Sequence, residues 1–165
     1  MRGHDKYGPH SPEPTWLFVG GVDLGLTRDC SAVVTLAVPK GGYAGRIRLA
    51  AHKLWRPTLG KKIDLTEVEQ YVLDLDEQFG LEFVALDPWQ SELLASRLEA
   101  GSAHRRRNQR RHFWTKPWAR EVQPTAANLR EQATLTIEYF QDHRLDLYPC
   151  EPLRRDLAHV QCCFS

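Results

Sequence analysis

The chain has 165 residues and a formal net charge of +1, with 42% hydrophobic and 26% charged residues. This length suffices for one domain with a buried core, and no apolar stretch approaches the roughly 20 residues that cross a bilayer. Residues 1–15 are rich in Gly, Pro and charge and lack the apolar centre of a secretory signal. We therefore expect a cytoplasmic protein with a mobile lead-in over residues 1–15 and one domain over residues 16–165.

Three strands are expected at the start of the domain. Residues 16–22 form a compact apolar run that ends at Asp23 and the turn-prone Gly25, and β-favouring runs follow at residues 31–38 and 46–55. The connections between them are short and contain glycine, which favours an antiparallel meander.

The apolar spacing then becomes helical. Thr66 and Glu69 have the spacing of a capping box, and apolar residues recur with a helical period until Gly80. A short buried strand over residues 82–86 follows and ends at Asp87.

A second helix is expected to start in the turn that contains Pro88 and to end at Gly101. Leu93, Leu94 and Leu98 are expected to form its apolar face.

The remaining elements are a strand, a helix, a strand and a helix. The best candidates are residues 112–115 for the first strand, 125–143 for the helix, 145–148 for the next strand and 152–160 for the last helix. The apolar face of the long helix is expected at Leu129, Ala133, Ile137 and Phe140.

This order of elements predicts an α/β fold with a mixed sheet. An antiparallel meander of three strands would be followed by parallel βα units, with helices on both faces of the sheet. With an acid closing the first strand and another closing the fourth, the order resembles the RNase H-like layout.

Asp23 and Asp87 each follow a buried apolar strand. If these two strands are parallel neighbours, both carboxylates emerge at the same sheet edge, where ligand sites of open α/β sheets gather. Two carboxylates brought close together favour a bound cation, and their hard oxygen atoms suit Mg²⁺ or Mn²⁺. Two such ions can promote hydrolysis of a phosphodiester. Alternatively, each acid is an ordinary strand-end or helix-cap residue.

Asp29 follows the next turn and reaches the same edge, or it caps its own turn through its backbone. Asp156 lies in the last expected helix between basic residues, and we expect a solvated side chain without a catalytic role.

Arginines are concentrated in the middle of the chain. Such a run is either a solvated loop or a contact to a phosphate backbone. The residues are Arg105, Arg106, Arg107, Arg110 and Arg111.

The cysteines do not have the spacing of a metal site. Cys162 and Cys163 are adjacent, and Cys30 and Cys150 lie far away without a nearby partner. We expect reduced thiols without a structural role.

With these residues identified, the chain resembles the nuclease domain of phage terminase large subunits, the DNA-packaging motors. The resemblance is carried by GVDLGLTRDCSAVV (21–34), by FVALDPWQSELLASRLEAG (83–101) and by the segment 122–157. It implies a metal-dependent endonuclease that cuts concatemeric double-stranded DNA, with Asp23 and Asp87 as the first two ligands of Mg²⁺ or Mn²⁺. It also implies a terminase ATPase domain, a small terminase subunit and a portal as partners.

The resemblance further implies a third acid on a late helix, beyond the part that matches LRRDLAHVQ. This sequence stops before such a residue, and no GxxxxGK[ST] motif occurs. We therefore expect an isolated nuclease domain that is incomplete at its C-terminus.

Two other functions stay open. The absence of the third acid favours an inactive DNA-binding or packaging-complex module, whose surface would combine the arginines with Phe113, Trp114 and Trp118. GVDLGLT also resembles the first phosphate-binding hairpin of actin-like and heat-shock ATPases, in which Asp23 would organise Mg-ATP.

Overall fold

A computed structural model of the chain describes residues 15–25, 29–40, 45–58, 61–88, 91–109 and 117–158, and only the backbone of residues 103–109. Residues 1–14 of the expected lead-in, the expected strand at 112–115 and the end of the last expected helix lie outside these ranges. Within the described ranges, no helix has the length and apolar character needed to cross a membrane.

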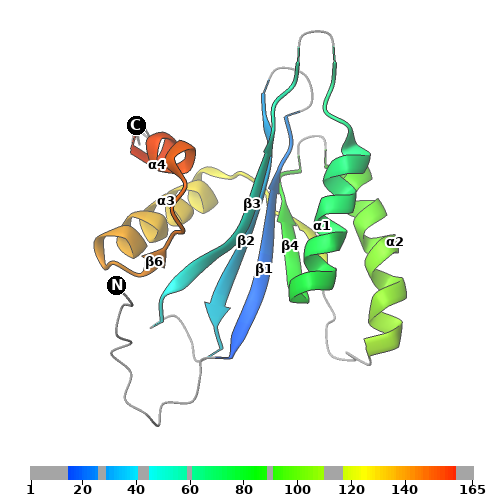
Figure 1. The fold of residues 1–165 in the computed structure, drawn as a ribbon, viewed down its shortest axis with the longest axis horizontal. Helices are drawn as coiled ribbons and strands as arrows, with labels where there is room; N and C mark the ends of the chain where they lie inside the picture. Colours follow the sequence, from blue (N-terminus) through cyan, green and yellow to red (C-terminus); the bar gives the residue numbers. More distant parts are fainter. Residues whose placement is uncertain are drawn as a thin grey trace.

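A mixed sheet of six strands forms the centre of the fold, in the order β5-β4-β1-β2-β3-β6. As predicted, the first three strands form an antiparallel meander and β4 pairs parallel to β1 (Figure 1). β5 pairs parallel to β4, and β6 pairs parallel to β3. The strands are β1 (Trp16–Asp23), β2 (Ser31–Pro39), β3 (Ile47–Trp55), β4 (Leu81–Leu86), β5 (Ala119–Glu121) and β6 (Leu145–Asp146).

Helices lie on both sides of the sheet, as the sequence predicts. α1 (Leu65–Phe79) and α2 (Glu92–Gln109) lie on one side, and α3 (Ala126–Gln141) and α4 (Glu151–Ala158) on the other (Figure 1). The hydrophobic core joins the sheet to α1 and α2. Its most deeply buried members are Val33, Val68, Val72, Val84, Leu86, Leu94, Leu98 and Trp118.

The boundaries of α1 follow from its caps. The Asp64 side chain accepts a hydrogen bond of 2.8 Å from the Thr66 backbone N–H, so Asp64 is the N-cap and the predicted capping box at Thr66 is wrong. Gly80 ends the helix as predicted, because it adopts the left-handed conformation with φ 66° that glycine tolerates best.

The predicted start and end of α2 are wrong, whereas its predicted apolar face is confirmed for Leu94 and Leu98 but not for Leu93. The helix begins at Glu92, after Pro88, and continues through Gly101. A Cβ atom at Gly101 would lie 3.2 Å from the Leu73 side chain of α1, so this glycine serves the close packing of the two helices. Leu94 is buried whereas Leu93 is 58% exposed, since adjacent helical residues point in directions about 100° apart.

The fifth strand lies at Ala119–Glu121, a segment that sequence patterns did not indicate. Its sequence, ARE, has no apolar alternation. Trp118, directly before it, is 1% exposed and donates a hydrogen bond of 2.9 Å from Nε1 to the Leu81 carbonyl of β4. This anchor and the pairing with β4 define the strand.

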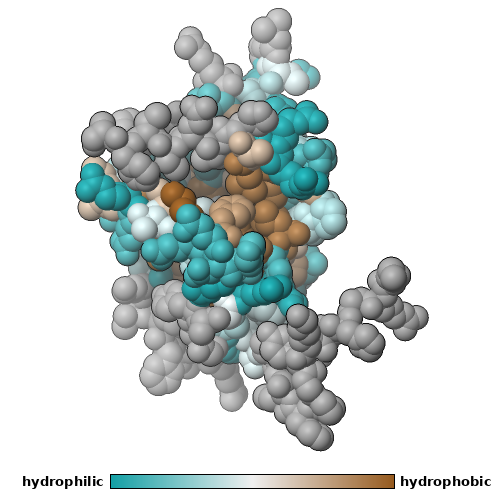
Figure 2. Space-filling model, turned by 90° about the vertical axis from the view of Figure 1, so that its left-hand side faces the viewer, coloured by the Kyte–Doolittle hydropathy of each residue, from teal (hydrophilic) through white to brown (hydrophobic). Residues whose placement is uncertain are grey.

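The expected apolar face of α3 is not buried. Leu129 is 51% exposed, and Ile137 and Phe140 are also exposed. Figure 2, which views the α3–α4 side, shows apolar side chains at the surface there, bordered by polar ones. The periodicity of this helix therefore predicted its extent but not its packing.

Candidate metal centre

Asp23 and Asp87 lie side by side at one end of the sheet. In the parallel pairing of β1 with β4, Val22 is in register with Leu86, and both side chains are buried in the core. The Asp87 N–H also donates a hydrogen bond of 3.4 Å to the Val22 carbonyl. Because side chains alternate along extended chain, the next residue on each strand points to the opposite face. The two acids therefore share both an edge and a face of the sheet, the face away from α1 and α2.

The β1–β2 connection brings Asp29 toward the same place. Gly25 and Ser31 close this connection: the Gly25 N–H donates to Ser31 Oγ at 3.2 Å, and Ser31 Oγ donates to the Gly25 carbonyl at 3.1 Å. A Cβ atom at Gly25 would lie 2.6 Å from the backbone carbonyl of Asp29. Only glycine therefore permits this close approach.

The three acids interact electrostatically. Burial raises the pKa of Asp23 above its ordinary value, and the negative charges of Asp87 and Asp29 raise it further. Asp23 therefore lies within electrostatic range of both Asp87 and Asp29. A cation bound between these carboxylates would relieve their repulsion.

The donor set fits a hard divalent cation held by two carboxylates. Across the described ranges, no three His, Cys, Asp or Glu side chains lie close enough together to ligate one ion. Asp29 therefore does not complete a compact three-ligand site with Asp23 and Asp87. Mg²⁺ in nucleic-acid enzymes is commonly held by one or two carboxylates, with water and substrate phosphate as further ligands.

The arginine block remains a prediction. Arg105, Arg106 and Arg107 belong to α2, but their side chains are outside the described part, as are Arg110 and Arg111 altogether.

The structure adds a basic residue that the sequence did not indicate. Arg120 of β5 is in register with Ala85, which alternates with the buried Leu86, so Arg120 lies on the same face as Asp87. Its guanidinium stacks on the Phe83 ring at 4.4 Å, on that face. Beyond the strand end, a cleft of about 330 Å³ is lined by Pro88, Gln123, Pro124 and Thr125. Sequence patterns indicated neither the position of Arg120 nor this cleft, because β5 is too short to show a pattern.

No protein-family model and no curated protein matches the sequence. Solved structures do match the fold. The HK97 bacteriophage large terminase superposes with a TM-score of 0.59 at 13% identity, and the match covers 81% of this chain and 30% of that chain. The large terminase nuclease from thermophilic phage G20c superposes with a TM-score of 0.56 at 14% identity, covering 83% of this chain and 61% of that one.

The fold is RNase H-like. The predicted resemblance to phage large terminases is confirmed at the level of fold, over more than four-fifths of the chain. The chain spans less than two-thirds of either terminase. The likeness in fold therefore does not show that this chain has the activities or partners of those whole proteins.

Proposed function

We propose that this chain is a metal-dependent endonuclease domain of a viral DNA-packaging terminase, which cuts concatemeric double-stranded DNA by phosphodiester hydrolysis. The observation that carries the proposal is the pairing of Asp23 with Asp87 on one face and at one end of parallel neighbouring strands. The RNase H-like fold, shared with two phage large terminases, supports it.

Asp23 and Asp87 would together hold Mg²⁺ or Mn²⁺ through their carboxylate oxygen atoms. Bound there, such ions supply positive charge for the attacking and leaving oxygen atoms of a phosphodiester. Asp87 would also orient the attacking water by accepting its hydrogen bond. Asp29, whose negative charge acts on Asp23, would strengthen cation binding.

The DNA backbone would lie across the face of the sheet that carries these acids. Arg120 presents its guanidinium there, anchored by a hydrogen bond of 2.9 Å from Nε to the Pro117 carbonyl. The arginines between Arg105 and Arg111 would contact phosphates farther along the duplex. The partners of such a domain would be a terminase ATPase domain, a small terminase subunit and a portal.

Nicking of supercoiled plasmid in the presence of Mn²⁺ tests the proposal. Asp23→Asn and Asp87→Asn should each lower the rate by at least about 100-fold, the order that loss of one charge-stabilising group costs in an active site. Asp74→Asn is the matched control, because Asp74 is an exposed acid of α1, on the opposite side of the sheet. Equal rates for the wild type and both site variants would contradict the assignment.

A second candidate is a DNA-binding module without cleavage activity. It is favoured by the lack of a compact three-acid group among the described residues. Such a module would bind duplex DNA with a steep dependence on salt, without divalent cation, and the wild type would not nick plasmid. Protection by nucleotide alone would instead favour the ATPase alternative.

A further inference from the structure

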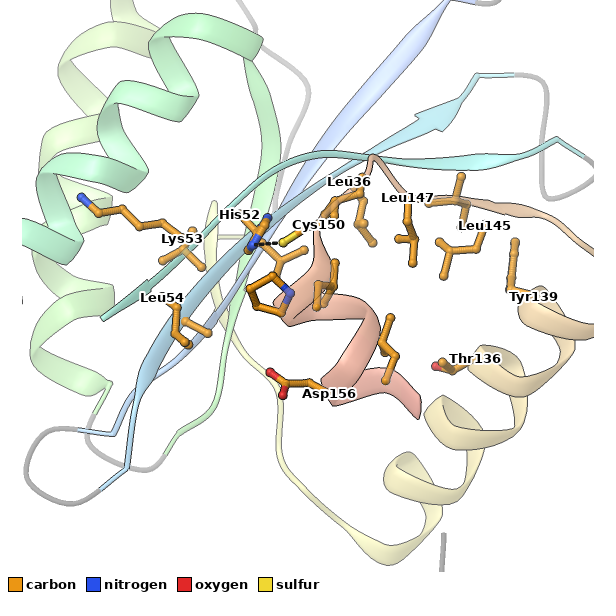
Figure 3. A pocket seen from close by; sticks show the side chains of 18 of the residues that line it. Leu36, His52, Lys53, Leu54, Thr136, Tyr139, Leu145, Leu147, Cys150 and Asp156 are labelled. Carbon is orange, nitrogen blue, oxygen red and sulfur yellow. Dashed lines mark hydrogen bonds between the residues drawn. The ribbon is translucent and has the colours of Figure 1, made fainter. Parts of the chain in front are cut away.

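A large cavity separates the sheet from α3 and α4. It has a volume of about 970 Å³ and lies over the faces of β2 and β3 that point away from the core (Figure 3). Most of its lining is aliphatic, which is typical of a site that takes an apolar ligand. The leucines that contribute include Leu36, Leu49, Leu54, Leu135, Leu153 and Leu157.

A cysteine and a histidine border this cavity together. Cys150 Sγ lies 3.7 Å from His52 Nε2, although the two residues are 98 positions apart in the sequence (Figure 3). The other ring nitrogen of His52, Nδ1, is hydrogen-bonded to the Tyr148 hydroxyl, and the Tyr148 ring stacks on the imidazole with centroids 5.4 Å apart. Tyr148 thus holds the imidazole ring of His52, and Nε2 lies toward the thiol.

This arrangement has the parts of an activated nucleophile. A thiol, a base within reach of it and a third group that orients the base are the common elements of nucleophilic sites. The Tyr148 hydroxyl, hydrogen-bonded to Nδ1, is the group that orients the imidazole. Cys30, which is also partly buried, has no histidine partner in the described part of the chain.

We propose that Cys150 is a nucleophilic thiol with His52 as its base, and that the leucine-lined cavity binds the hydrocarbon chain of an acyl thioester whose acyl group Cys150 accepts. Cys150 Sγ forms a bond to the acyl carbon while its proton passes to His52 Nε2. The bond from that carbon to the donor sulfur breaks, and the departing thiolate takes the proton from His52. The products are an acylated Cys150 and a free thiol, with no net oxidation or reduction.

The apolar lining of the cavity predicts a preference for a long acyl chain. Each methylene group of a hydrocarbon chain that leaves water for the leucine-lined cavity favours binding, whereas an acetyl group has almost no apolar surface to bury there. We therefore expect palmitoyl-coenzyme A to acylate Cys150 faster than acetyl-coenzyme A does.

Site-resolved mass spectrometry of the full chain, incubated with each of these two donors, tests the proposal. Palmitoylation of Cys150 should be at least about 100-fold faster than that of Cys30 in the same sample, the order that a positioned base contributes. His52→Gln should lower the Cys150 rate to that of Cys30. Asp23→Asn should leave it unchanged, which separates this site from the proposed nuclease.

Two results would overturn the proposal. One is a Cys150 rate no higher than that of Cys30 in the wild type. The other is an equal Cys150 rate with the acetyl and palmitoyl donors. Both are measured on the unmodified sequence, so neither depends on whether His52→Gln folds.

Discussion

Gly25→Ala tests how the β1–β2 connection positions the acids. The added Cβ atom would lie 2.6 Å from both the carbonyl carbon and the carbonyl oxygen of Asp29, and 2.7 Å from its Cβ. Ordinary contacts of a Cβ atom lie at 3.4–4 Å. These neighbours are mostly backbone, so they cannot rotate away as the end of a flexible side chain would. Asp29 must therefore move away from Gly25.

The size of the overlap sets the expected cost. Forcing one extra carbon into a well-packed place typically costs about 1–3 kcal/mol of unfolding free energy. For a domain of this length, that corresponds to a fall in Tm of about 2–12 °C. The displaced Asp29 should also reduce Mn²⁺-dependent nicking if its charge contributes to cation binding.

Gly21→Ala is the matched control. Gly21 lies in β1 on the same face as Asp23, but a Cβ atom there would meet nothing within 4 Å. This variant should keep its Tm or gain slightly, because alanine has less conformational freedom than glycine in the unfolded chain. Thermal unfolding of both variants, followed by circular dichroism, gives the comparison. Equal Tm values for Gly25→Ala and Gly21→Ala would refute the proposed packing of this connection.

Two further predictions concern the acid pair and the fifth strand. Folding raises the pKa of Asp23 above 3.8. The stability that comes from protonated Asp23 is therefore complete below pH 3.8, and it is lost as the pH rises through the pKa of Asp23 in the folded state. Asp23→Asn should therefore be more stable than the wild type at neutral pH without divalent cation, and the unfolding free energies of the two proteins should converge in acid. Urea unfolding across this pH range measures both free energies. A difference between them that does not change with pH would contradict the prediction. Trp118→Phe should lower the unfolding free energy by about 1–3 kcal/mol, because it leaves the Leu81 carbonyl without the Trp118 Nε1 donor. Urea unfolding measures that loss as well, and a cost below about 0.5 kcal/mol would show that water replaces the indole donor.

The sequence by itself determined the elements whose boundaries are local. The apolar runs before Asp23 and Asp87 are β-strands because their β-favouring residues are bounded by polar and turn-forming ones. Gly80 ends α1 because glycine adopts a positive φ at little cost. From these local signals, the meander and the parallel pair could be predicted, and with them the edge at which the two acids meet.

Only the tertiary structure decided what depends on partners distant in the chain. β5 has no apolar pattern of its own and forms because β4 offers free hydrogen-bonding groups and Trp118 is buried beside it. Gly101 lies within α2 because α1 packs closely there, which a local helix-stop signal does not reveal. His52 and Cys150 meet because β3 and the segment before α4 border the same cavity. Sequence periodicity records which residues share a face, but which faces meet is a property of the folded chain.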